Sequence, residues 1–202
     1  MLNYYGFPKL RELAFLIPPL LSWRLATLEG VMDLLNSLDL RPKKILDVGC
    51  AAGFFSKRLA RLFPNAEITA IDLSPPMIEF ARRNSQNFKN LCFTTADIFQ
   101  FDRSDFDLTT AFYLLMVTGV ERTIPRLLET VRLGGLLLVN MTSFTPLTTI
   151  HFHFYKILNR SELDLMSPEK FRRIAERHGK IVKLVELSET EGSYLALLRR
   201  TR

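Results

Sequence analysis

The segment from Ile45 to Phe63 constrains the fold of this chain more than any other part of its sequence. It opens with an apolar run that ends at Asp47, passes through a bend containing Gly49 and Gly53, and takes a helical pattern from Ser56. A buried parallel strand, a glycine-containing turn and a helix start together form a corner that accepts nucleotides. Glycine lets the backbone approach a ligand, and the helix start offers unpaired N–H groups. The segment therefore predicts an α/β fold with a nucleotide-type ligand at this corner.

The spacing of the glycines restricts the class of nucleotide. A dinucleotide-binding fingerprint requires the pattern G-x-G-x-x-G. Counted from Gly49, the two later glycine positions hold Ala51 and Phe54, so the sequence disfavours an NAD-type ligand. A second acidic residue, Asp72, ends the next apolar run, at the place where a ribose would be held.

The bend resembles the first motif of class I S-adenosylmethionine (SAM)-dependent methyltransferases, D/E-x-G-x-G-x-G. Asp47, Gly49 and Gly53 match this motif, and Ala51 stands where its middle glycine is usual. The resemblance covers about residues 43–140 closely and extends more loosely to the end of the chain. It implies SAM as the cofactor, with Asp47 orienting the amino group of the ligand directly or through water. The methyl group of Ala51 would narrow the space beside the methionine part.

Two further landmarks follow in the order that the family has them. The segment Ile71-Asp72-Leu73-Ser74 resembles the second-strand acidic motif. It implies that Asp72 accepts both ribose hydroxyls and that Leu73 and Met77 flank the sugar and the adenine. The segment Thr95-Ala96-Asp97-Ile98 resembles the corner that reads adenine. There Asp97 would accept from the exocyclic amine and the Ile98 N–H would face a ring nitrogen, although Asp97 taken alone also fits a helix cap or a turn.

The remaining landmarks complete the predicted sheet. A fourth strand reaches Phe112, which we expect at the cofactor corner, and the pair Gly134-Gly135 resembles the start of the family's fifth strand. The apolar pattern predicts strands near 44–48, 67–72, 91–95, 106–112, 135–141, 181–187 and 193–199, and helices near 53–63, 75–87, 121–132 and 168–178. This alternation predicts a three-layer α/β sandwich: a mostly parallel seven-stranded sheet with helices on both faces. A short turn-like link before the last strand predicts a hairpin, which makes that strand antiparallel.

The chain divides into an N-terminal helical lid segment, residues 1–40, and a SAM-binding domain, residues 41–202, which we expect to form a single domain overall. The apolar stretch Leu13–Trp23 contains two prolines and is too short to span a bilayer. It also lacks the small-residue cleavage pattern of a signal peptide. Helical spacing from Leu20 favours a helix that packs on the sheet or closes the pocket. A sharper hypothesis is that aromatic and basic residues in this segment make peripheral membrane contact or admit a lipophilic acceptor.

Candidate catalytic residues come from outside the cofactor core. His151 and His153 point the same way in an extended chain, and either could act as a general base or bind a substrate anion, assisted by Tyr113 or Tyr155. No third ligand is identifiable beside the two histidines, so we predict no metal site. The fourth strand is followed by neither Asn-Pro-Pro-Tyr nor Asp-Pro-Pro-Tyr, which argues against methylation of a nucleic-acid base amine or a glutamine.

Charge and cysteine content bear on partners and location. The net charge of +6 makes RNA a candidate partner, but the basic residues are scattered along the sequence and no separate RNA-binding module is present. Two cysteines give no disulfide framework, which favours a reducing, cytoplasmic compartment. We therefore expect a SAM-dependent methyltransferase that transfers a methyl group by direct in-line displacement to a small molecule, with a lipophilic acceptor as the sharper hypothesis. An RNA methyltransferase and a non-catalytic SAM-binding protein, at which Ala51 hints, are the alternatives.

Overall fold

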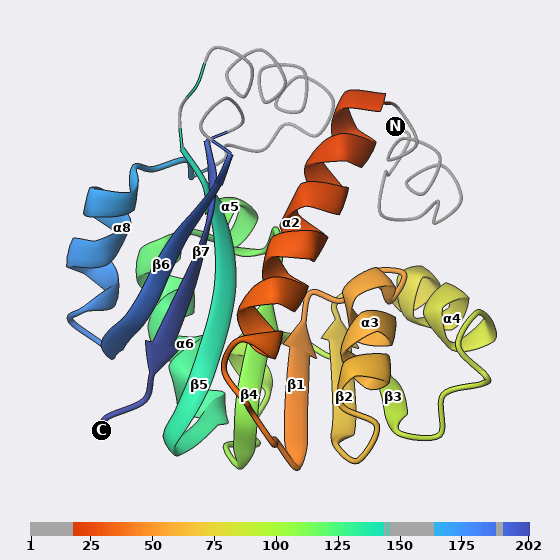
Figure 1. Cartoon of the computed structure of the whole chain (residues 1–202). Helices are drawn as coiled ribbons and strands as arrows, with labels where there is room; N and C mark the ends of the chain where they lie inside the picture. Colours follow the sequence, from red (N-terminus) through yellow and green to blue (C-terminus); the bar gives the residue numbers. More distant parts are fainter. Residues whose placement is uncertain (1–17, 144, 146–163, 189–191) are drawn as a thin grey trace.

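A computed structural model describes residues 18–143, 145, 164–188 and 192–202 of the chain. The described strands form one seven-stranded sheet in the order β3-β2-β1-β4-β5-β7-β6 (Figure 1). The strands are β1 (Lys44–Val48), β2 (Glu67–Asp72), β3 (Leu91–Thr95), β4 (Phe106–Ala111), β5 (Val131–Thr142), β6 (Lys180–Ser188) and β7 (Ser193–Arg199). The first five strands run parallel, and β7 lies antiparallel between β5 and β6. The predicted sheet and its antiparallel last strand are confirmed.

Helices cover both faces of the sheet (Figure 1). One face carries α2 (Pro18–Asn36), α3 (Phe54–Leu62) and α4 (Pro75–Arg83), and the other carries α5 (Leu115–Thr118), α6 (Val120–Thr130) and α8 (Pro168–Ala175). A short 3₁₀ helix, η2 (Ile98–Gln100), follows β3. Strands buried on both faces read as continuous apolar runs, which is why most strand positions could be predicted from the sequence.

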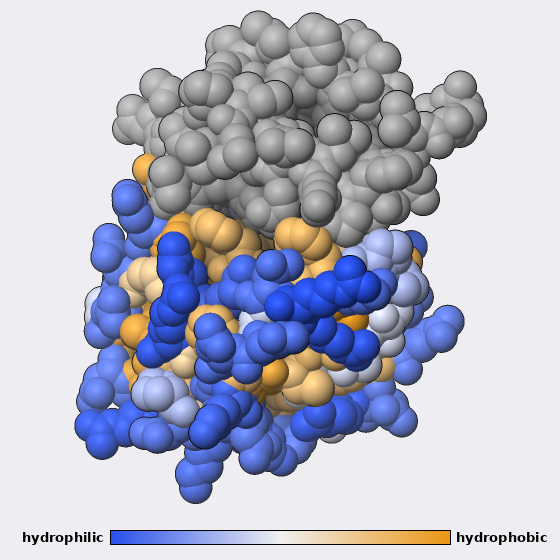
Figure 2. Space-filling model, turned by 90° about the vertical axis from the view of Figure 1, so that its right-hand side faces the viewer, coloured by the Kyte–Doolittle hydropathy of each residue, from blue (hydrophilic) through white to orange (hydrophobic). Residues whose placement is uncertain are grey.

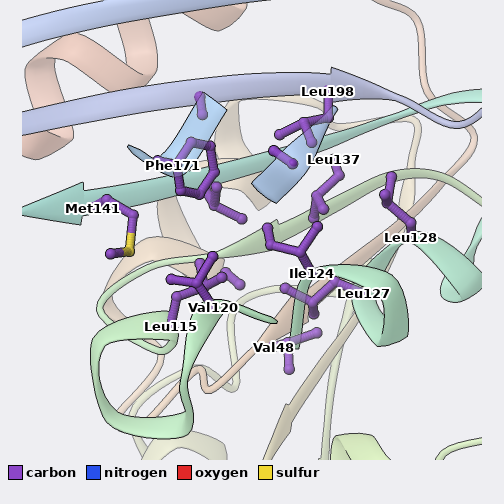
Figure 3. Packing of buried hydrophobic residues seen from close by; sticks show 14 of the residues in the cluster. Val48, Leu115, Val120, Ile124, Leu127, Leu128, Leu137, Met141, Phe171 and Leu198 are labelled. Carbon is purple, nitrogen blue, oxygen red and sulfur yellow. The ribbon is translucent and has the colours of Figure 1, made fainter. Parts of the chain in front are cut away.

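The two faces of the sheet have separate hydrophobic cores because side chains alternate along each strand. Leu46 and Val48 of β1 join the core under α5, α6 and α8, part of which Figure 3 shows around Ile124 and Phe171. Ile45 of the same strand joins the core under α2 and α3. Both cores lie below the edge at which the parallel strands end, and they hold that edge in place.

Some predicted boundaries were wrong for local reasons. The helix predicted near 121–132 ends at Thr130, and β5 begins at Val131 rather than at residue 135. The strand can begin this early because the pairing of β5 with β4 contains a register shift, which accommodates the two glycines. The helix predicted near 75–87 ends at Arg83, where the Asn84 side chain donates to the Phe80 carbonyl. The helices α5 and η2 were not predicted.

Helix α2 lies across the face of the sheet and packs against β6 and β7. Its described side chains Val31, Leu34 and Leu35 are buried in the core that α3 shares. The described part of this helix is thus a packing element of the sheet. Residues 1–17 lie outside the described residues, so membrane contact through them stays a prediction. None of the described helices has the length and apolar content that a bilayer crossing requires.

Candidate functional site

The bend between β1 and α3 has an unusual backbone. Gly49, Ala51 and Gly53 all have positive φ, with values of 72°, 48° and 79°. The N–H groups of Gly49 and Cys50 both donate to the Ile71 carbonyl, at 2.8 and 3.0 Å, so the bend is fastened to the end of β2. A left-handed conformation is costly for residues other than glycine. Ala51 therefore holds a strained conformation where the family motif has glycine.

Gly53 is required for space as well as for conformation. A Cβ at this position would lie 2.6 Å from Cζ of Phe93, a buried ring under α4, whereas a Cβ at Gly134, also at positive φ (76°), would meet nothing within 4 Å. We expect Gly53→Ala to lower the free energy of unfolding by about 1–2 kcal/mol more than Gly134→Ala, because only the former adds overpacking to backbone strain. Urea unfolding of the two variants measures this difference. Equal losses would show that the bend yields to the added methyl group.

Asp72 is fixed at the tip of β2 by the backbone around it. One carboxylate oxygen accepts from the Ala51 N–H at 2.8 Å, and the other accepts from the Ser74 N–H at 2.9 Å. Each carboxylate oxygen can accept more than one hydrogen bond. Asp72 is half-buried and lines a cavity, so both oxygens keep capacity for ligand hydroxyls in a fixed orientation.

Asp97 and Ile98 lie beside Asp72, at the tip of β3. One Asp97 oxygen accepts from the Phe99 N–H at 3.0 Å and caps η2, as the capping alternative for this residue predicts. The Ile98 N–H begins η2 and donates to no group in the described part of the chain. An acceptor and a donor thus stand next to each other at the cavity wall, which is the pairing that an adenine edge requires.

The strand tips enclose a cavity of about 710 Å³, a size typical of ligand-binding sites. Its walls are largely apolar, and its polar groups belong to the tips of β2 and β3 and to α5 and α6. The lining residues are Val48, Gly49, Ile71, Asp72, Leu73, Ser74, Pro75, Pro76, Ala96, Asp97, Ile98, Phe99, Leu114, Val117, Thr118 and Arg122. Figure 2 shows the side of the molecule that carries β3 and α4, where hydrophilic residues predominate with hydrophobic residues between them.

Asp47 lies beneath the bend and does not line this cavity. Its side chain is buried, and its two oxygens accept from the hydroxyls of Ser56 at 2.6 Å and Thr110 at 2.8 Å. Burial raises the pKa of the Asp47 carboxyl from 3.8 to about 6. The two hydroxyls oppose this shift, and the charge of Asp72 adds to it. The geometry thus gives Asp47 a role in joining β1, α3 and β4. Its expected orientation of the ligand amino group, directly or through water, stays a prediction.

Other predicted cofactor residues also support the cavity from outside. Met77 of α4 is fully buried, and Phe112 is buried with its ring stacked on Phe55 at 4.3 Å between centroids. Neither side chain reaches the cavity, and neither do Ala51 and Gly53, which shape the bend. Direct contact with sugar and adenine is therefore available to Leu73, which is 70% exposed at the cavity rim, and not to Met77.

The structure describes only one of the three predicted catalytic residues. Tyr113 follows β4 with a φ of 59°, a rare conformation for a bulky side chain. Its N–H donates to Oδ1 of Asn140 at 2.6 Å, and its hydroxyl donates to Oγ1 of Thr27 on α2 at 2.8 Å. Such strain concentrates at functional sites. His151 and His153 lie outside the described residues, and their catalytic role stays a prediction.

Helix α5 and the start of α6 add wall residues that sequence reasoning missed. Leu114 stands over the bend, so that a Cβ on Gly49 would lie 3.1 Å from its Cδ1, and Val117 and Thr118 continue the wall. The Arg122 guanidinium lies 3.9 Å from the centroid of the Phe99 ring at the cavity wall. The apolar run that follows the fourth strand was the only signal for these residues.

The arrangement fits a sulfonium nucleoside. Two fixed carboxylate oxygens face the position of a diol, an acceptor and an unpaired N–H face the position of a purine edge, and apolar walls suit the flat faces of the base. Within the described ranges no group of three His, Cys, Asp or Glu side chains is placed to hold a metal ion. The fold and the cavity thus define a nucleotide-binding α/β domain of the class I methyltransferase type.

Comparison with known proteins identifies the family. A family model described as a methyltransferase domain matches residues 41–178, and the chain belongs to this methyltransferase-domain family. The malonyl-[acyl-carrier protein] O-methyltransferase of Acetivibrio thermocellus is 29% identical over 136 residues, which cover 65% of this chain and 48% of that protein. The ubiquinone biosynthesis O-methyltransferase of Xanthomonas oryzae pv. oryzae is 32% identical over 117 residues, which cover 54% and 47%.

A solved structure supports the same fold. Magnesium protoporphyrin IX methyltransferase from Synechocystis, with bound SAH (the demethylated product of SAM), aligns over 88% of this chain and 85% of its own, with a TM-score of 0.70 and 18% sequence identity. At that identity the likeness shows the fold alone. The chain spans about half the length of the curated relatives that it matches.

Proposed function

We propose that this protein is a SAM-dependent methyltransferase that acts on a small-molecule acceptor. The observation that carries the proposal is the pair of Asp72 oxygens, each held by a backbone N–H, at the wall of a cavity that also contains Asp97 and the unpaired Ile98 N–H. Membership of the methyltransferase-domain family supports the same conclusion.

The residues of the chain have mainly a positioning task. SAM supplies a methyl group that its sulfonium already activates. Asp72 would bind the ribose, and Asp97 and Ile98 would bind the adenine edge. The backbone at Gly49 would contact the amino-acid part of SAM. The apolar walls would exclude water from the reacting atoms once the ligands are bound. The acceptor then needs only a lone pair held in line with the methyl group, and a general base is required only where that acceptor remains protonated.

An oxygen atom of a small acceptor is the proposed methylation target. The curated relatives described above are named as O-methyltransferases of malonyl-[acyl-carrier protein] and of ubiquinone biosynthesis. The exposed apolar side chain of Val117 at the cavity wall favours an acceptor with an apolar part. A lipophilic acceptor, reached from the cytoplasm with peripheral membrane contact through the N-terminal segment, agrees with the composition of that segment.

Methyl-labelled SAM tests this function. We expect incubation of the protein with labelled SAM and cell extract to place label in a small-molecule fraction, with an apolar acceptor partitioning into organic solvent. Heat-denatured protein is the control for spontaneous methylation. Label found only in RNA would replace the proposal with the RNA methyltransferase alternative. SAM binding without any transfer would favour a non-catalytic SAM-binding protein.

A further inference from the structure

Three buried side chains at the carboxyl edge of the sheet each carry a polar atom that has no hydrogen-bond partner. Asn140 Nδ2, Thr142 Oγ1 and Ser193 Oγ are buried and make no hydrogen bond, and the other such atom among the described residues is the Ser85 hydroxyl. Exposed fractions of the three side chains are 0%, 0% and 1%. Most buried polar atoms in proteins are paired, because an unpaired one loses its hydration without compensation. A cluster of three therefore requires an explanation.

The three side chains share one face of two neighbouring strands. Thr142 of β5 and Ser193 of β7 are directly paired across the ladder, and Asn140 is two residues before Thr142. Leu138 of β5 and Leu195 of β7 belong to the core under α2, so the alternation of side chains places all three polar groups on the α2 face. In Figure 1 this is the face that α2 crosses. We call Asn140, Thr142 and Ser193 the polar strip.

The polar strip adjoins the cofactor cavity through the end of β4. Oδ1 of Asn140 accepts from the Tyr113 N–H at 2.6 Å, and the next residue, Leu114, lines the cavity and stands over the bend. That bond also fixes the orientation of the Asn140 amide, because a backbone N–H needs the oxygen. The free Nδ2 is therefore a donor, directed away from Tyr113 and adjacent to the strand tips.

The atoms of the polar strip determine the chemistry of a matching ligand. An amide nitrogen only donates, whereas the hydroxyls of Thr142 and Ser193 can donate or accept. Each of the three groups can donate a hydrogen bond, and all three side chains are neutral. We propose that the polar strip is the subsite that binds the methyl acceptor, by donating hydrogen bonds to oxygen atoms of that molecule. This inference rests on the proposed methyltransferase function and names the acceptor class as a molecule with a carbonyl, carboxylate or phenolic oxygen.

The test compares a Thr142→Val, Ser193→Ala double variant with Ser85→Ala. Both changes remove unpartnered buried hydroxyls, but Ser85 is not part of the strip. We expect the double variant to transfer label from methyl-labelled SAM to extract acceptors at least about 10-fold more slowly, since a site built to hydrogen-bond a substrate is sensitive to loss of its donors. Its affinity for SAH is expected to stay unchanged, and its melting temperature to stay equal or rise. Ser85→Ala is expected to leave labelling unchanged.

An Asn140→Asp variant isolates the donor. It keeps an oxygen for the Tyr113 N–H and replaces Nδ2 with an acceptor atom, so we expect label transfer to fall while SAH still binds. Wild-type labelling rates in the double variant would overturn the inference. A parallel loss of SAH affinity and melting temperature would also overturn it, because that result would show that the strip stabilises the fold through an internal water. Failure of the wild-type protein to transfer label would instead overturn the proposed function, and this inference with it.

Discussion

Asp72→Ala is expected to weaken SAM and SAH binding by about 100-fold or more. The wild-type carboxylate faces the cavity with both oxygens oriented by the Ala51 and Ser74 N–H groups, so it can accept two ligand hydroxyls without reorganisation. Hydrogen bonds to a charged group contribute about 1.5–3 kcal/mol each, and about 1.4 kcal/mol corresponds to a tenfold change in affinity. Isothermal titration with SAH measures the loss.

Asp105→Ala is the matched control for this prediction. Asp105 is an exposed carboxylate that pairs with Lys44 at the amino end of the sheet, remote from the cavity. We expect its removal to leave the dissociation constant unchanged. Circular dichroism of Asp72→Ala should show a folded protein, because losing two local hydrogen bonds does not remove either core. A dissociation constant of the folded Asp72→Ala variant within a few-fold of wild type would show that Asp72 does not hold the ligand.

Asp47→Asn is expected to gain stability relative to wild type as the pH rises. Burial raises the folded-state pKa of Asp47 to about 6, against 3.8 for the ordinary carboxyl. Its contribution to wild-type stability is therefore fully present below about pH 4 and is lost as the pH rises through about 6. The shift corresponds to a swing of about 3 kcal/mol. An asparagine side chain is neutral at every pH in this range, and it can still form hydrogen bonds with the Ser56 and Thr110 hydroxyls.

Denaturant unfolding of both proteins between about pH 4 and pH 8 measures that swing as the difference of the two free energies. The control variant, Asp105→Asn, is expected to show almost no change in this difference over the same range. The Lys44 partner lowers the pKa of Asp105, so the stabilisation by that carboxylate is present throughout the range and is lost only below about pH 4. If the difference in free energy of unfolding between wild type and Asp47→Asn did not change with pH, Asp47 would be hydrated in solution and would titrate as an ordinary carboxyl.

The sheet could be predicted because its signals are local. Apolar runs that are bounded by polar residues and turns predicted both ends of β1, β2, β3 and β7 to the residue. The four-residue helix α5 was missed because Leu114–Val117 continues the apolar run of the fourth strand, and so short a helix has no periodicity to detect. The early start of β5 was missed because its glycine pair looks like a strand boundary, while pairing with β4 resumes across a register shift.

The site could be predicted only in part, because burial depends on distant residues. Asp72 and Asp97 follow their strands directly, and the parallel topology brings both to one edge. Asp47 follows the same rule in sequence, yet its carboxylate is enclosed by Ser56 and by Thr110, which lies 63 residues away in the chain. The polar strip likewise forms only when β7 inserts beside β5, a pairing between residues far apart in the sequence.

A crystal structure of the protein with SAH would test the central assignment most directly. We expect the adenosine to lie in the cavity at the tips of β1, β2 and β3, with both ribose hydroxyls donating to Asp72 and the adenine amine donating to Asp97. Asp47 should remain bonded to Ser56 and Thr110 beneath the bend. An adenosine bound outside this cavity, or a ribose that makes no contact with Asp72, would contradict the assignment.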